Sequence, residues 1–419
     1  MSKNTLFSSF ILIALILSGG FVFSVNGLWD ISVIYVGEAD VTVYVIALDG
    51  VNASGVNDVS RMVEGILGAC RVNSSCYITE EVWAISPIVL GEIKINTTSI
   101  IVEDWKTYKK LVEKTTNAII INVHGETLPV PQNYTKEEWT DKIAEAMLTR
   151  NITWVHTTGY PLYNYQQQGD KQKTWGEQGF QRLMSHIGLN NVTCRPKVEE
   201  TELISMHDHA EANLERGWKQ LADACYVEHG RPLNCSYFKD YIILPIWGTD
   251  YGYATGAIVR FAPNNQTNPG IYIHIGTYKT YDSLKKPTDA DFMRGYAGAA
   301  AAIWTSAYKT VAEKKIAEAK QAIVKAEADG RTKGLNQAKQ LLEEAKQYYQ
   351  IANYLGALET ARQAKKTANH TTKPNFLETY GPHLTIAIIA GAIIASALLI
   401  KRKTNPKKEK GKPKMKTPH

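Results

Sequence analysis

The sequence lacks the short motifs that mark common nucleotide-dependent and serine-dependent enzymes. Neither G-x-G-x-x-G nor G-x-x-x-x-G-K-[S/T] occurs, so no Gly-rich loop for a nucleotide phosphate is predicted. A Gly-x-Ser-x-Gly elbow is also missing, which argues against a serine hydrolase. The spacings of the five cysteines are not those of paired zinc ligands. We therefore expect neither a cofactor nor a metal ion.

Most of the chain has little net charge. The net charge of the 419 residues is +6, but residues 401–419 contain nine Lys or Arg against one Glu, which is +8 in that segment alone. Residues 1–400 are therefore nearly neutral, at −2. Proteins that bind nucleic acid usually carry a basic patch or stripe, so we do not expect a nucleic-acid partner.

A long apolar run is present near the carboxyl end. Residues 384–400 contain no charged residue and, as a helix rising 1.5 Å per residue, would extend roughly 26 Å, close to the hydrocarbon thickness of a bilayer. The basic segment 401–419 follows directly, as in a stop-transfer signal with a cytoplasmic tail. We predict one transmembrane helix, with the rest of the chain outside the cell and membrane lipid as a partner; a buried core helix is the alternative.

The amino-terminal segment and the glycosylation motifs agree with this location. Residues 1–27 combine one Lys, an apolar run and small residues, which predicts a signal peptide cleaved near residue 27, with an uncleaved anchor as the alternative. Nine Asn-x-Ser/Thr motifs all precede the apolar run. We expect glycans at their asparagines: Asn52, Asn73, Asn96, Asn133, Asn151, Asn191, Asn234, Asn265 and Asn369.

Four of the five cysteines flank short polar loops. Cys70 with Cys76 and Cys225 with Cys235 would each close a small loop, and disulfides are favoured outside the cell. Cys194 is left over, and we expect an idle thiol there; a nucleophile or an intermolecular bridge is the alternative.

Strand and helix patterns alternate through residues 28–310. Residues 41–48 and 117–123 are apolar and β-branched, whereas residues 105–115 and 135–150 have helical spacing. Asp104 is placed to cap the first of these helices, and Thr135 with Glu138 predicts a capping box for the second. The order predicts an α/β ectodomain with a mainly parallel, doubly wound sheet and helices on both faces.

Three stretches carry a family resemblance: NAIIINVHGE, WVHTTGYP, and GAIVRFAP followed by GIYIHIGTY and a long helix. In this order they resemble the class I glutamine amidotransferase-like fold of the trehalose-utilisation type, over about residues 40–310. Enzymes of that family place a cysteine at a sharp turn after a strand, but here the turn after Val123 reads His124-Gly125-Glu126. The family's late His-x-Glu pair is represented by His274 alone. The resemblance therefore implies the fold without the amidotransferase activity.

Residues 311–368 are rich in Ala, Lys, Glu and Gln and show apolar stripes at helical spacing. We predict a membrane-proximal α-helical hairpin, or a three-helix unit, with a break near Gly356 and a stalk over residues 369–383. It is similar to alanine-rich hairpins near the membrane in archaeal surface proteins.

The candidate chemistry lies at strand ends. His124 and Glu126 follow one predicted strand and His156 ends the next, and ligands of open parallel sheets bind beyond the carboxyl ends of strands. These three side chains could bind a metal or act in acid–base catalysis. The alternative is that they close the strand ends by bonding to loop backbone. His207-Asp208-His209 is not expected to bind metal, because residues two apart on a helix diverge.

These observations favour a single-pass, glycosylated surface protein that acts in binding or cell-envelope organisation. Its partners would be membrane lipid and other envelope proteins or glycans. One alternative is an extracellular hydrolase or amidase that uses His124, Glu126 and His156. Another is a solute-binding receptor, which would require a second lobe.

Overall fold

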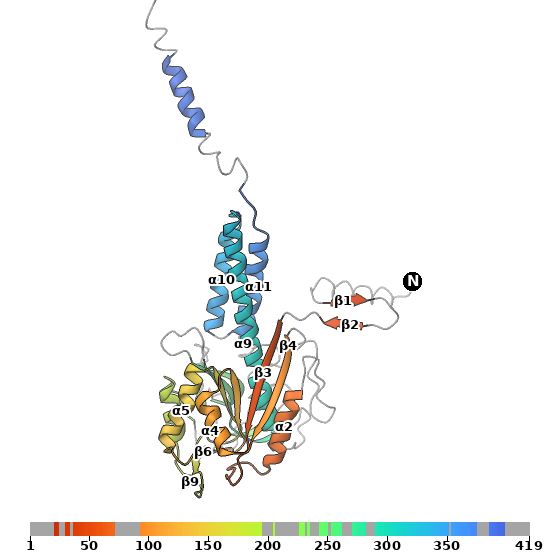
Figure 1. Ribbon diagram of the computed structural model, residues 1–419, viewed down its shortest axis with the longest axis vertical. Coiled ribbons are helices and arrows are strands. Elements are labelled where there is room, and N and C mark those ends of the chain that lie inside the picture. Colours follow the sequence, from red (N-terminus) through yellow and green to blue (C-terminus); the bar gives the residue numbers. More distant parts are fainter. Residues whose placement is uncertain are drawn as a thin grey trace, which may run out of the picture.

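The computed structural model describes residues 21–24, 30–33, 37–71, 93–194, 204–205, 226–230, 233–234, 243–249, 253–261, 270–281, 290–351, 353–374 and 385–398. An α/β unit lies at one end, and a long helical unit projects from it (Figure 1). The His207-Asp208-His209 triplet and the tail over 401–419 lie outside the described residues.

The centre of the α/β unit is a nine-stranded sheet in the order β10-β13-β14-β15-β7-β5-β3-β4, with β12 paired to β14. Its strands are β3 (Gly37–Ile46), β4 (Ile93–Val102), β5 (Ala118–Asn122), β7 (Ile152–His156), β10 (Ile204–Ser205), β12 (Leu233–Asn234), β13 (Ile243–Thr249), β14 (Tyr253–Phe261) and β15 (Gly270–Ile275). β5, β7 and β15 are buried along their whole length, as expected for strands covered on both faces.

The sheet is parallel from β4 to β15 and antiparallel beyond it. β4, β3, β5, β7 and β15 pair in parallel. β14 returns antiparallel to β15, with Phe261 opposite Gly270, and β13 is antiparallel to β14. The connections between β13, β14 and β15 are too short for a crossover, so these strands form hairpins. The expected mainly parallel sheet is therefore confirmed for its central part.

Both faces of the sheet are covered by helices. α2 (Val59–Arg71) and α9 (Ala290–Ala328) pack on one face, where Ile66, Tyr296 and Trp304 belong to the same buried cluster as Ile121. α4 (Trp105–Lys114), α5 (Lys136–Thr149) and α6 (Gln178–His186) cover the other face, where Trp139 is fully buried.

The predicted helix caps are confirmed. The Asp104 side chain accepts a hydrogen bond from the backbone N–H of Thr107 at 2.8 Å and begins α4. At the start of α5, Thr135 and Glu138 exchange the two hydrogen bonds of a capping box. Each cap satisfies backbone N–H groups that have no partner inside the helix.

The described helical unit contains three helices. This matches the predicted three-helix unit and not the two-helix hairpin. α9 is 39 residues long and runs without interruption from the sheet into this unit, where α10 (Leu335–Gln350) and α11 (Tyr354–Asn369) pack beside it. Small residues such as Ala319, Ala338 and Ala364 form its core. The predicted break near Gly356 is wrong by three residues, because Asn353 caps α11 by accepting a hydrogen bond from the Gly356 N–H.

A further helix covers residues 385–398 and is drawn beyond the helical unit in Figure 1. Every residue in it is exposed. Within the described part of the chain, no helix has both the length and the apolar character needed to cross a membrane.

Three small sheets complete the described strands. β1 (Phe21–Ser24) pairs with β2 (Asp30–Val33), and β11 (Tyr226–Gly230) pairs with β16 (Thr277–Tyr281). β6 (Thr127–Val130) lies parallel to β8 (Asn164–Gln167), which pairs with β9 (Lys173–Thr174).

Candidate functional site

The strand order reverses between β3 and β5. From β3 the chain moves to β4 on one side, and then to β5, β7 and β15 on the other side. In open α/β sheets, ligands bind beyond the carboxyl ends of the strands at such a switch point. A site formed by His124, Glu126 and His156 would therefore lie at this edge of the sheet.

The side chain of His124 lies across the switch point. Its Nε2 accepts a hydrogen bond of 2.9 Å from the backbone N–H of Leu48, in the segment that follows β3. The backbone N–H of His124 donates to Oδ1 of Asn122 at 3.1 Å. Because Nε2 is an acceptor, the imidazole is neutral with its proton on Nδ1. Burial lowers the pKa of His124 to about 4, which agrees with a neutral ring.

The loops that follow β3 and β5 are joined by their backbones. Ser54 and Gly125 form a parallel bridge, and the N–H of Glu126 donates to the carbonyl of Ser54 at 3.0 Å. Gly125 has φ +59, and a Cβ there would lie 2.2 Å from the Ser54 oxygen. Only glycine allows so close an approach. The crevice at the switch point is therefore closed by hydrogen-bonded chain.

Glu126 holds the turn that follows β7. Its Oε1 accepts a hydrogen bond of 2.7 Å from the backbone N–H of Tyr160. Gly159, with φ +67, passes so near that a Cβ would lie 2.3 Å from the same oxygen. The carboxylate thus ties the turn after β5 to the turn after β7.

His156 is buried at the end of β7 and stacks on His274. The ring centroids are 5.6 Å apart and the planes differ by 8°. Nε2 of His156 lies 3.2 Å from the carbonyl of Gly159 and donates to it in the neutral tautomer with the proton on Nε2. Burial, with smaller effects of His274 and Arg294, lowers the pKa of His156 to about 3. The ring is therefore uncharged at neutral pH.

The structure brings the three predicted residues to one edge of neighbouring strands. The register aligns Asn122 with His156 and His156 with His274 across β5, β7 and β15. His124, Glu126 and His156 each direct a polar atom to loop backbone. No group of three or more His, Cys, Asp or Glu is arranged to hold a metal ion in the described ranges. These contacts match the alternative in which the residues close the strand ends.

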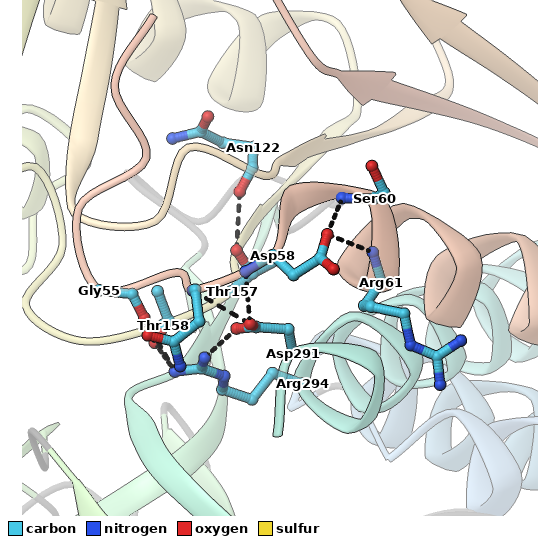
Figure 2. A network of polar contacts seen from close by, with 10 residues as sticks. Gly55, Asp58, Ser60, Arg61, Asn122, Thr157, Thr158, Asp291 and Arg294 are labelled. Carbon is cyan, nitrogen blue, oxygen red and sulfur yellow. Dashed lines mark hydrogen bonds and ion pairs between the residues drawn. The ribbon is translucent and has the colours of Figure 1, made fainter. Parts of the chain in front are cut away.

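A buried ion pair lies beside this edge and was not predicted. Asp291 and Arg294, in the first turns of α9, pair with side-chain exposures of 4% and 1% (Figure 2). Oδ2 of Asp291 accepts hydrogen bonds from the N–H groups of Asn57 and Asp58, at 3.0 and 2.8 Å. Asp58 in turn caps α2 by accepting from Ser60 and Arg61. The aspartate therefore connects the start of α9 to the start of α2.

Arg294 extends the network to the sheet. Its guanidinium donates to the hydroxyl of Thr158 and to the carbonyl of Gly55, the latter at 3.2 Å (Figure 2). The neighbouring Thr157 hydroxyl donates to the carbonyl of Asn122 at 2.8 Å. The network thus joins four segments: both helix starts, the loop after β3 and the turn after β7. One sequence signal existed, since an Asp and an Arg three residues apart precede fourteen uncharged residues, 295–308, in the same helix.

The other predicted site residues are only partly described. Cys70 is a buried thiol in α2, and burial raises its pKa to about 12. Its predicted partner Cys76, together with Cys225 and Cys235, lies outside the described residues, so both disulfides stay predictions. Cys194 is buried against the α4–α6 side of the sheet.

The glycosylation motifs divide by exposure. The asparagine is exposed at five of the six described motifs, which are Asn52, Asn96, Asn133, Asn191 and Asn369. Asn151 is partly buried: its Nδ2 donates to Oδ1 of Asn117 at 3.0 Å, and its Oδ1 accepts from Lys309 at 2.6 Å. The side chains of Asn73, Asn234 and Asn265 are not described.

Known proteins do not identify the chain. No family model matches it, and no curated protein is significantly similar to it. The function must therefore be argued from the structure.

Proposed function

We propose that the protein is a single-pass, N-glycosylated membrane protein whose α/β unit acts in binding or envelope organisation without catalysis. The observation that carries the proposal is the helix over 385–398. It exposes Ile386, Ile388 and Ile393 at 64%, 68% and 64%, so no other described segment of the chain covers these side chains. Burying such residues is worth about 1.5–3 kcal/mol each, and a bilayer offers that burial. We take this helix as the centre of a transmembrane segment over 384–400.

The closed crevice supports a non-catalytic role. A catalytic site needs a cavity in which the reacting groups meet a substrate. Here the Ser54–Gly125 bridge and the His124 contact with Leu48 occupy the switch point. The Asp291–Arg294 network beside it bonds to its own members and to backbone, which favours a rigid recognition unit.

The amidotransferase-like family remains part of the proposal. It is supported by the parallel order of β4, β3, β5, β7 and β15 and by the position of His274 at the end of β15. The turn after β5 carries His124-Gly125-Glu126 in place of a cysteine nucleophile. A relative of that family that has lost its chemistry would retain such a scaffold.

Membrane extraction tests the anchor. The full chain in cell membranes should resist sodium carbonate, and protease added to intact cells should remove the α/β unit while sparing the basic tail. A variant with Ile388→Lys and Ile393→Lys should be released by carbonate, because charged residues at the centre of a span cost about 2.5–3.5 kcal/mol each. Val324→Lys with Ile351→Lys, at exposed apolar residues of the helical unit, is the matched control and should stay bound. Release of the unmodified chain by salt would refute the proposal.

An extracellular hydrolase or amidase is the second candidate, and one observation favours it. Nδ1 of His124 and Nδ1 of His156 are buried and have no hydrogen-bond partner within the described part of the chain. Such atoms are typical of sites that bond to a substrate or a water. Turnover of aryl esters or anilides that is lost in both His124→Gln and His156→Gln would establish this function. If the unmodified protein and both variants hydrolyse these substrates at the same background rate, the binding role stands and the enzyme is excluded.

A further inference from the structure

The free end of the three-helix unit carries a concentration of positive charge. We call it the basic tip and define it as residues 325–339 and 362–373. These residues contain eight Lys or Arg against two acidic residues: Lys325, Arg331, Lys333, Lys339, Arg362, Lys365, Lys366 and Lys373 against Glu327 and Asp329. The rest of the chain before residue 401 has an acidic balance, because residues 1–400 together carry −2.

The acidic groups of the tip are already engaged. Glu327 pairs with Lys339 at 2.6 Å, and Asp329 pairs with Arg331 at 3.2 Å. The tip contains no further acidic residue to offset its charge, and Lys325, Lys366 and Lys373 are all exposed. Like charges held together in this way repel one another, and a negatively charged surface would relieve that repulsion.

A groove extends the positive surface along the same end. It has a volume of about 390 Å³ and lies between α9 and α11. Arg362 and Lys366 line it from α11, His370 lines it from the C-cap of that helix, and Lys315 lines it from α9. Glu318 is its single acidic residue, and it is shared by Lys315 and Lys365 at 2.9 and 2.8 Å. A groove of this size and charge suits a phosphate-bearing head group.

The chain leaves the three-helix unit at the basic tip. The N–H of Lys333 donates to the carbonyl of Thr372 at 3.1 Å, and the N–H of Thr372 donates back at 3.4 Å. Arg331 adds hydrogen bonds to the carbonyl of Ala368 and the hydroxyl of Thr371. The segment after α11 is thus pinned to the α9–α10 turn. From there residues 375–384 lead to the apolar helix, and they reach at most on the order of 35 Å when fully extended.

We propose that the basic tip docks on anionic lipid head groups of the membrane into which the chain inserts. The inference rests on the proposed membrane anchor, because the short connection is what holds the tip near the lipid surface. Each Lys or Arg near an anionic surface strengthens binding to that surface roughly five-fold. The three exposed lysines Lys325, Lys366 and Lys373 together would therefore give a strong preference for anionic lipid. Docking would hold the three-helix unit upright and fix the distance of the α/β unit from the bilayer.

Photo-crosslinking to lipid tests this docking. The full chain carries a photoreactive amino acid at Thr332, an exposed residue of the α9–α10 turn, and is reconstituted into vesicles of phosphatidylcholine with or without 30% phosphatidylglycerol. Lipid labelling should be about ten-fold stronger with phosphatidylglycerol, and it should fall in 1 M NaCl because salt screens charges. The same group at Lys171, an exposed residue of the β8–β9 hairpin, should label little lipid in either vesicle.

Charge reversal identifies the residues responsible. The variant with Lys325→Glu, Lys366→Glu and Lys373→Glu should lose the phosphatidylglycerol-dependent labelling. The control with Lys106→Glu, Lys110→Glu and Lys114→Glu changes three exposed lysines of α4 and should keep it. Equal labelling in both vesicle types, or no effect of the tip variant, would overturn the docking.

Carbonate extraction of the same vesicles separates the two proposals. A chain that resists carbonate but shows no lipid labelling from Thr332 would retain its anchor and lose the docking. A chain that carbonate releases, but that labels phosphatidylglycerol from Thr332 beforehand, would keep the docking and lose the anchor. Release without labelling would refute both.

Discussion

The backbone N–H of Leu48 donates a 2.9 Å hydrogen bond to Nε2 of His124, across the point where the strand order reverses. The bond joins the segment after β3 to the turn after β5, and both residues are buried. It needs an imidazole whose Nε2 carries no proton, so the contact exists only while His124 is neutral.

Acid should therefore weaken the fold. The pKa values of His124 and His156 are lowered to about 4 and about 3, against an ordinary value of 6.5. The unfolded chain binds more protons than the folded chain below pH 6.5, so the stabilisation is complete above that pH and declines as the pH falls toward 4. As the pH falls from 7.5 to 5, each of the two histidines should lower the unfolding free energy by about 2 kcal/mol, because the unfolded chain takes up the proton that the folded chain excludes. Urea denaturation at both pH values measures this loss.

A variant separates this effect from general acid sensitivity. His124→Gln should remove about half of the loss between pH 7.5 and 5. If His124→Gln keeps the full dependence, a different group is responsible.

The Asp291–Arg294 pair should contribute far more to the free energy of unfolding than a surface ion pair does. Arg294→Met leaves a buried carboxylate without its cation and should lower the unfolding free energy by about 3–5 kcal/mol. Lys142→Met breaks the exposed pair with Glu145, 2.8 Å apart, and should cost about 0–1 kcal/mol. Denaturant titration of both variants makes the comparison, and similar losses would show that the buried network contributes little.

Gly125 should tolerate no side chain. Gly125→Ala places a Cβ 2.2 Å from the Ser54 oxygen and also adds strain at φ +59, so we expect a loss of more than about 2 kcal/mol. Gly169→Ala is the matched control, because Gly169 has φ +87 but no atom within 4 Å of the added Cβ. It should lose only about 1 kcal/mol, the cost of the dihedral angle alone. Equal melting temperatures for the two variants would contradict the close approach.

Glycan occupancy should follow exposure. Mass spectrometry of the protein from its native membranes should find glycans at Asn133, Asn191 and Asn369 and none at Asn151, whose amide bonds to Asn117. Asn151→Ala should destabilise the fold by about 1 kcal/mol, as expected for a lost hydrogen bond. Asn133→Ala, at an exposed motif, should not. Full glycan occupancy at Asn151 would contradict this prediction and would show that the protein is glycosylated before it folds.

Local patterns in the sequence predicted the local structure well. Asp104 and Thr135 are caps because their side chains reach the N–H groups of the next turn, and such contacts depend on residues only three positions apart. The strand over 117–123 was recognisable from its unbroken β-branched run. The break in the helical unit was misplaced, because Gly356 lowers helix propensity whereas Asn353 supplies the cap that decides the boundary.

The site depended on contacts that no local pattern contains. Leu48 and His124 are 76 positions apart, and Arg294 and Thr158 are 136 apart. The sequence indicated that His124, Glu126 and His156 follow neighbouring strands, but not which loop each side chain would meet. The closing of the crevice needed the Ser54–Gly125 approach, which only the assembled loops reveal.

The uninterrupted α9 has a mechanical consequence. Its 39 residues make a rod of about 58 Å whose first turns hold the Asp291–Arg294 pair and whose far end meets the basic tip. A pull on the carboxyl-terminal segment would travel along this rod without a hinge to absorb it. The force would arrive at the carboxyl ends of the strands, where Asp291 and Arg294 bond to the loop after β3, so strain at one end of the molecule would be felt at the other.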